Sequence, residues 1–170
     1  MNSLIINADD FGISKVVNEA IVEVFKRGYI DRTTIIVNMQ DFYDACEKAK
    51  KFGFTDKVGL HINIVEGKPL TKEILNTSLC ENGEFSHKAL FEKQGYLLSN
   101  VEKMALEEEI EAQISLFLNA GFSLKHLDSH RHSHCRPSVL PIILKVARRR
   151  GFESVRLSRN IPIREIKGIK

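Results

Sequence analysis

Thr33-Thr34-Ile35-Ile36-Val37-Asn38 is β-branched and apolar almost throughout. A run of this kind is expected of a strand that is buried on both faces of a parallel sheet. The segments before and after it indicate how such a sheet is built and covered.

A helix is predicted on each side of this strand. Over residues 14–27, Ser14 is a suitable N-cap, apolar residues recur at helical spacing and a glycine ends the pattern. A second helix is predicted over 41–52, and β-rich runs at 3–7 and 58–64 are predicted strands. The first part of the chain is therefore predicted to be three β-α repeats.

Residues 65–98 interrupt this alternation, because they contain turn signals and only weak periodicity. We predict that they form an insertion or a lid over the functional site. The alternation then resumes, with helices predicted at 101–119 and 137–150 and strands at 124–128 and 154–157.

The alternating pattern predicts an α/β fold with mainly parallel strands and right-handed crossovers, either an open sheet or part of a (β/α) barrel. The 170 residues suit a single domain, 1–170. A complete barrel of eight units typically takes about 250 residues and at least about 200, so the length disfavours one. In both arrangements ligands bind at the carboxyl ends of the strands.

The composition is that of a globular protein. With 43% hydrophobic and 28% charged residues, the chain is neither collagen-like nor disordered throughout. The net charge of +3 is uneven, because 148–170 is strongly basic. A basic tail can bind nucleic acid or anionic lipid. Here Arg148, Arg149 and Arg150 lie at the end of a predicted helix, where positive charges interact favourably with the negative end of the helix dipole. We therefore expect neither nucleic acid nor membrane as a partner.

The cysteines and the first residues indicate the compartment. Cys46, Cys80 and Cys135 are odd in number and lack C-x-x-C spacing, which favours neither disulfides nor a zinc ribbon. The apolar run at the start soon reaches Asn7 and has no basic segment before it, which argues against a signal peptide or membrane span. We expect a cytoplasmic protein.

Polar residues gather where the predicted strands end. These residues are Asp9, Asp10, Asn38, His61, Asp128 and His130. Adjacent aspartates are by themselves common in turns. A histidine inside an apolar strand needs a partner or a metal, although a hydrogen-bonded core histidine is the simpler alternative.

The strongest local signal is His126-Leu127-Asp128-Ser129-His130-Arg131-His132-Ser133-His134. Its histidines alternate in phase with the aspartate, so they share one face wherever the segment is extended. Imidazole and carboxylate together suit a divalent transition metal, and a compact site needs about three protein ligands. A loose metal-binding surface is the alternative.

Together these residues predict a site with two histidines and one carboxylate. One aspartate of the first strand would join His61 and His130 around an ion, which would activate water and polarise a carbonyl or phosphoryl group. The second aspartate could accept a proton. The residues alone indicate a metal-assisted hydrolase or isomerase.

Four motifs also carry a resemblance to a known family. They are Asn7-Ala8-Asp9-Asp10-Phe11-Gly12, Gly59-Leu60-His61, Gly67-Lys68-Pro69-Leu70 and the histidine-rich segment. In order and spacing they resemble the YdjC-like carbohydrate deacetylases, which include chitooligosaccharide deacetylase. The resemblance implies a deformed, incomplete TIM-like (β/α) barrel. It also implies removal of acetyl groups from small N-acetylated sugars with a divalent metal, usually magnesium.

By motif position, the resemblance implies that Asp10, His61 and His130 are metal ligands and that Asp9 is the general base. The resemblance implies substrate-binding or supporting roles for Asp128, His132, His134 and Arg156, and Asn38, at the end of the second predicted strand, is a candidate for the same roles. Magnesium prefers oxygen ligands, so the two histidines favour zinc, cobalt or nickel.

The length departs from the family, whose members run to roughly the 250 residues typical of such barrels. The chain is therefore expected to be short at its C-terminus: a fragment, a reduced member, or a protein that completes its sheet as a homodimer. Two other functions stay open, a metal-dependent phosphoesterase or sugar isomerase and a non-catalytic metal-binding protein.

Overall fold

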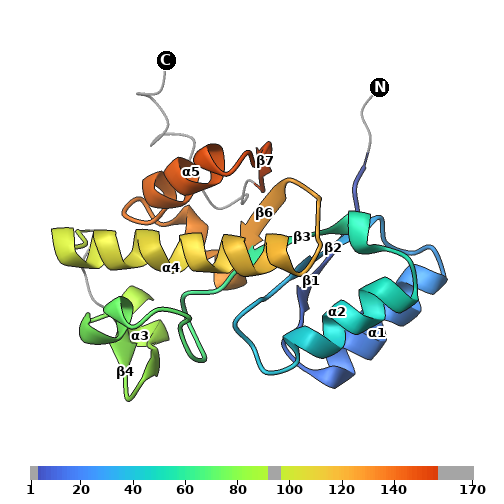
Figure 1. The fold of residues 1–170 in the computed structure, drawn as a ribbon, viewed down its shortest axis with the longest axis horizontal. Helices are drawn as coiled ribbons and strands as arrows, with labels where there is room; N and C mark the ends of the chain where they lie inside the picture. The colour runs from blue at the N-terminus through green and yellow to red at the C-terminus, as the bar shows by residue number, and fades with distance from the viewer. Residues whose placement is uncertain (1–3, 92–96, 157–170) are drawn as a thin grey trace.

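The computed structural model describes residues 4–91 and 97–156 (Figure 1). Its main sheet has five parallel strands whose spatial order follows the chain. The strands are β1 (Asn7–Phe11), β2 (Arg32–Ile35), β3 (Val58–Ile62), β6 (His126–Ser129) and β7 (Ser154–Val155). Sequential order with right-handed crossovers is the winding of a barrel, whereas a doubly wound sheet reverses direction.

The sheet is open. Within residues 4–91 and 97–156, β1 and β7 each pair with a single neighbour and form its two edges. The α/β prediction with mainly parallel strands and an incomplete barrel is therefore confirmed.

Four longer helices connect the strands. They are α1 (Lys15–Lys26), α2 (Phe42–Lys51), α4 (Asn100–Asn119) and α5 (Leu140–Arg149). In Figure 1, α1 and α2 lie together at one end of the sheet, and α4 and α5 pack together at the other. None of the helices in the described part of the chain is both long enough and apolar enough to cross a membrane.

The predicted helix starts are confirmed where a side chain caps them. Ser14 accepts a hydrogen bond from the Val17 amide, and Ser99 and Glu102 form a capping box at the start of α4. The start predicted at residue 137 is wrong. The helix α5 begins at Leu140, with a proline in its own first turn.

The predicted first strand, 3–7, is displaced. Residue 3 lies outside the described part of the chain, and β1 runs from Asn7 to Phe11 through a β-bulge. Ala8 pairs with Thr33 but Phe11 pairs with Ile35, so β1 carries one extra residue. That residue allows the polar Asp-Asp pair to continue the strand instead of ending it.

Two unusual backbone positions shape the bulge. Asp10 has a φ of 67°, and Gly12 has a φ of 96°. A Cβ atom on Gly12 would lie only 2.7 Å from the carbonyl oxygen of Ile36, so a larger side chain does not fit there. The backbone after the bulge is thus held tightly against the end of β2.

The two faces of the sheet differ in polarity. In-register residues lie on the same face of parallel strands. His61 is in register with Asp128, and His126 with Ser154, on the inner face. Leu60, in register with Leu127, is fully buried on the face that the helices cover. The inner face is therefore where polar chemistry collects.

The segment that was predicted as an insertion or lid packs into the common hydrophobic core. It contains 3-10 helix η2 (Glu73–Asn76), an antiparallel hairpin of β4 (Cys80–Glu81) and β5 (Glu84–Phe85), and α3 (His87–Phe91). Buried apolar side chains within it include Ile74, Leu79, Phe85 and Leu90. Its role as a lid stays a prediction. A further 3-10 helix, η1 (Thr55–Lys57), precedes β3.

Candidate metal centre

Three side chains from separate strands meet at the carboxyl end of the sheet. Asp10 comes from the bulge of β1, His61 from β3, and His130 directly follows β6. Asp10 Oδ1 lies 3.2 Å from His61 Nε2 and 2.7 Å from His130 Nδ1. Each residue offers one ligand atom, and these atoms all lie within 4.8 Å of one another. The cluster can therefore hold a metal ion.

His61 is held by a buried carboxylate. Its Nδ1 lies 2.5 Å from Asp128 Oδ1, and the Thr34 hydroxyl donates to Asp128 Oδ2 at 3.3 Å. His61 is 2% exposed and Asp128 0% exposed. Because Asp128 occupies Nδ1, the ring presents Nε2 to Asp10, as in the carboxylate–histidine pairs that orient metal ligands.

The electrostatics of the cluster follow from these contacts. Hydrogen bonds from His130 and His61 hold the pKa of Asp10 well below its usual range. Burial lowers the pKa of His61, but the hydrogen bonds to Asp10 and Asp128 outweigh burial and raise that pKa to about 9. Burial raises the pKa of Asp128, but the hydrogen bond to His61 and the charges of His61 and Arg156 together outweigh burial, so the net shift is downward. The metal-free cluster therefore combines ionised carboxylates with a protonated His61.

Asp9 joins the cluster through Arg156. Arg156 Nη1 lies 2.6 Å from Asp9 Oδ2 and 2.9 Å from Asp128 Oδ2, and Nη2 lies 2.8 Å from Asp9 Oδ1. The Asn7 amide also donates to Asp9 Oδ1, at 2.7 Å. The guanidinium thus holds both Asp9 and Asp128, the partner of His61, while Asp9 Oδ2, which accepts from Arg156 alone, keeps a lone pair free to accept a proton.

Comparison with known proteins places the chain. The family model described as "YdjC-like protein" matches residues 3–168. The chain belongs to the YdjC-like protein family.

Curated relatives of this YdjC-like chain are named carbohydrate deacetylase. The protein of Brevibacillus brevis is 40% identical over 144 residues, which are 85% of this chain and 55% of that protein. The protein of Clostridium beijerinckii is 35% identical over 175 residues, covering 98% of this chain and 61% of that protein. The chain thus spans a little over half the length of these relatives.

A solved structure shares the YdjC-like fold. The crystal structure of a candidate cellobiose-phosphate cleavage protein from Enterococcus faecalis V583 matches with a TM-score of 0.79 and 32% identity. The match covers 92% of this chain and 59% of that one. The arrangement of strands described above is therefore that of a larger relative.

Most residues that the sequence singled out lie together in the YdjC-like chain. Those in the cluster are Asp9, Asp10, His61, Asp128, His130 and Arg156. Asn38 does not contact it in the described part of the chain. Its side-chain amide donates to the backbone oxygens of Asn63 and Lys68 and so anchors the loop after β3.

The face expected for alternating histidines in an extended segment stops at the end of β6, so it does not include His132 or His134. Strand β6 ends at Ser129, and His130 begins the 3-10 helix η3 (His130–Cys135), which contains Arg131 and His132 at positive φ. Consequently His132 is exposed, and His134 is buried, with its Nδ1 2.6 Å from the Ser129 hydroxyl oxygen and its Nε2 2.9 Å from the Arg156 backbone oxygen.

His126, the first histidine of the segment, lies apart from the ligands. Its Nδ1 is 2.8 Å from the Ser154 hydroxyl oxygen. Burial lowers the pKa of His126 to about 4, with a further contribution from Arg32. This ring is therefore neutral at pH 7 and belongs to the inner face of the sheet.

One residue of the site was missed. Glu66, in the loop after β3, places Oε1 2.7 Å from His130 Nε2. The available signal was a lone carboxylate directly after the apolar strand and before Gly67. Its contact depends on the path of the loop, which spacing alone does not give.

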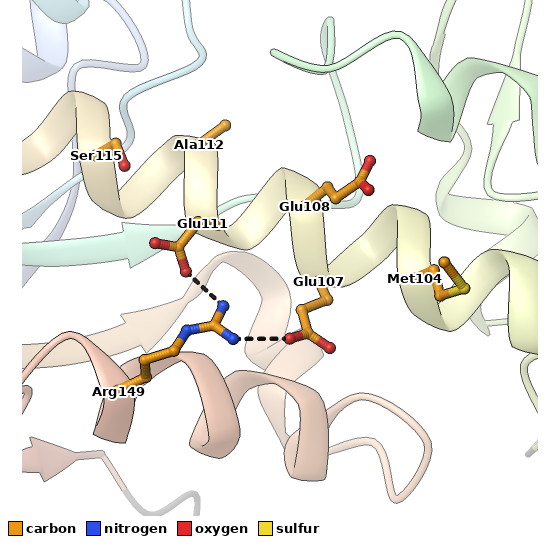
Figure 2. Close-up of a pocket in the computed structure, with 7 residues that line it drawn as sticks. All are labelled: Met104, Glu107, Glu108, Glu111, Ala112, Ser115 and Arg149. Atoms are coloured by element: carbon orange, nitrogen blue, oxygen red, sulfur yellow. Dashed lines mark hydrogen bonds and ion pairs between the residues drawn. The ribbon is translucent and has the colours of Figure 1, made fainter.

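A separate cavity of about 520 Å³ lies where α4 meets α5 (Figure 2). Arg149 reaches Glu107 at 3.1 Å and Glu111 at 2.8 Å there, and Met104 and Ala112 supply apolar wall. Its wall has three glutamates and one arginine, so the cavity is acidic even with these two ion pairs. None of the cluster residues lines it, so this cavity is separate from the candidate metal centre.

Proposed function

We propose that this chain carries the metal centre of a carbohydrate deacetylase, which hydrolyses the acetyl amide of small N-acetylated sugars such as chitooligosaccharides. The carrying observation is the convergence of Asp10 of β1, His61 of β3 and His130, which directly follows β6, in a site where Arg156 holds Asp9. The names of the curated relatives support the reaction and the substrate class.

The donor set fits a divalent ion. Two imidazole rings face one carboxylate oxygen, and each ring has its far nitrogen held by another carboxylate. Nitrogen-rich sites favour zinc, cobalt or nickel over the magnesium usual for the family. When bound, such a metal supplies Lewis acidity for the amide carbonyl.

The residues around the ligands would do the remaining chemistry. In our proposal Asp9 accepts the proton of the attacking water, and Arg156 keeps that carboxylate in position. Asp128 holds the ring of His61 so that Nε2 stays directed at Asp10. The reaction would run in the reducing cytoplasm, where the free thiols of Cys46, Cys80 and Cys135 are stable.

The test is acetate release from N,N′-diacetylchitobiose. Protein treated with a chelator should be inactive and should recover with Zn²⁺, Co²⁺ or Ni²⁺. His61→Ala and His130→Ala should abolish recovery, whereas His87→Ala, which changes a histidine stacked on Phe91 in α3, should not. Acetate release that survives both the chelator and His61→Ala would overturn the proposal.

A product screen separates the alternative functions. The name of the solved neighbour justifies including a phosphorylated disaccharide among the substrates. Release of phosphate or formation of a ketose without acetate would favour a phosphoesterase or an isomerase at the same centre.

A further inference from the structure

Glu66 contacts His130 on the side of the ring that faces away from Asp10. Glu66 Oε1 lies 2.7 Å from His130 Nε2, while His130 Nδ1 lies 2.7 Å from Asp10 Oδ1. A carboxylate only accepts hydrogen bonds, so the hydrogen on Nε2 is directed at Glu66. A metal bound between His130 and Asp10 would use the Nδ1 lone pair in place of the contact between Nδ1 and Asp10, and the ring would keep its hydrogen on Nε2.

The two histidines are thus held in opposite senses. Asp128 occupies Nδ1 of His61 and leaves Nε2, whereas Glu66 occupies Nε2 of His130 and leaves Nδ1. Both remaining nitrogens face the same oxygen of Asp10. Glu66 therefore holds His130 as Asp128 holds His61. Neither the family motifs nor the spacing assigned this function to Glu66.

We propose that Glu66 is the positioning residue of His130, and that the metal is bound through Nδ1 of His130 and Nε2 of His61. This inference rests on the metal centre of the proposed function. It concerns how a ligand is oriented, so it stands or falls separately from the identity of the reaction.

The loop is built to hold Glu66 in place. Asn63 Oδ1 accepts from the Glu66 amide at 3.3 Å, and Asn63 Nδ2 donates to the Glu66 carbonyl at 2.8 Å. Gln113 of α4 fixes Asn63 in turn, accepting from its amide at 3.1 Å and donating to its carbonyl at 2.7 Å. Asn63 and Gln113 are both 0% exposed. A buried polar chain therefore fixes the backbone of Glu66 at both its amide and its carbonyl.

A simple surface ion pair with Arg131 explains the geometry less well. Arg131 Nη2 is 3.4 Å from Glu66 Oε2, and its side chain is 53% exposed. Exposed pairs of that kind contribute little. The shorter contact is to His130, whose side chain is 9% exposed, so orientation of that ring is the stronger consequence.

The first measurement is Zn²⁺ affinity, by competition with a chelating dye. Glu66→Ala should weaken binding roughly 10–100-fold, the usual effect of removing a carboxylate behind a histidine ligand. Glu66→Gln keeps an accepting oxygen and should recover most of the affinity. Glu81→Ala removes an exposed carboxylate of the hairpin and should change nothing. Unchanged affinity in Glu66→Ala would overturn the inference.

The second measurement identifies the bound nitrogens, using NMR-active Cd²⁺ and nitrogen-labelled histidine. The metal should couple to Nε2 of His61 and Nδ1 of His130, and the His130 coupling should weaken or move to Nε2 in Glu66→Ala. Coupling to Nε2 of His130 in the unmodified protein would overturn the inference. If the couplings are as expected but no acetate is released, the orientation stands and the proposed reaction fails.

Discussion

Arg156 donates hydrogen bonds to both carboxylate oxygens of Asp9, at 2.6 and 2.8 Å, although the two residues are 147 positions apart in the chain. Asp9 lies in β1 and Arg156 directly follows β7, so the ion pair links the two edge strands of the open sheet across its inner face. The same guanidinium reaches Asp128, which holds His61. One cation therefore connects the proposed base to the support of a proposed ligand.

Asp9→Asn should separate catalysis from metal binding. Loss of the proposed base should lower the rate of acetate release by roughly 10²- to 10⁴-fold. Zn²⁺ affinity should stay unchanged, because Asp9 is not one of the three clustered ligands. Acetate assays and dye competition on the same preparation check both halves, and an unchanged rate would remove Asp9 from the mechanism.

Arg156→Lys should reproduce part of that defect. Lysine keeps the charge but cannot form the bidentate pair with Asp9. The turnover number should therefore fall while Zn²⁺ affinity is retained. A matched change at Arg148→Lys, on the basic last turn of α5, serves as the control and should leave turnover intact.

Asp128→Asn should weaken metal binding through its effect on His61. Because Asp128 fixes Nδ1 of His61, Zn²⁺ affinity should fall roughly 10–100-fold. Asp56→Asn changes an exposed carboxylate of η1 and is the control. Equal affinity in the two variants would show that His61 does not need this partner.

Metal binding should release a proton from His61. Its pKa of about 9 means that at pH 7.5 the metal must displace that proton, so apparent affinity should rise by up to about tenfold per pH unit and flatten above pH 9. Calorimetry in buffers of different ionisation enthalpy measures the proton release. An affinity that is equal at pH 6.5 and pH 8.5 would contradict the assignment of His61 as a ligand.

The same group gives the metal-free fold a pH dependence. A histidine whose folded pKa is raised stabilises the fold fully below its ordinary value of 6.5, and that contribution is lost as pH rises through about 9. Urea unfolding of the metal-free protein should therefore show a loss of stability between pH 7 and pH 10. His61→Gln should remove this dependence.

Glu109→Ala should destabilise the fold. Glu109 is 0% exposed and accepts hydrogen bonds from the Leu70 and Thr71 amides and from Gln113. Losing the hydrogen bonds that this buried carboxylate accepts should lower the free energy of unfolding by about 3 kcal/mol. The adjacent exposed position supplies the control, because Glu108→Ala should stay within about 0.5 kcal/mol.

Sequence reasoning located four of the five strands of the described sheet and the three clustered residues for one physical reason. The apolar period places the strands, and parallel strands present their carboxyl ends at one edge, which brings Asp10, His61 and His130 together. The boundary between β6 and η3 was not predictable from alternation, because His130 continues the period although the backbone turns there.

Contacts made by loops and by the edge strands of the sheet could not be predicted from the sequence. The pairing of Glu66 with His130 depends on a loop that Asn63 and Gln113 fix through hydrogen bonds. The pairing of Asp9 with Arg156 depends on how far the open sheet curves. A periodic pattern of apolar residues predicts neither the curvature of the sheet nor the path of the loop.

The extra residue in β1 lets the neighbouring residues Asp9 and Asp10 make different contacts. In a regular strand Asp9 and Asp10 would face opposite sides of the sheet, but here Asp9 reaches Arg156 and Asp10 reaches the histidines. A deletion at this dipeptide would remove either the contact with Arg156 or the contact with the histidines. A substitution at Asp9 or Asp10 would change one of these contacts and leave the other. The pair is therefore the point at which an evolving or redesigned sheet could exchange the proposed base and still keep the cluster of Asp10, His61 and His130.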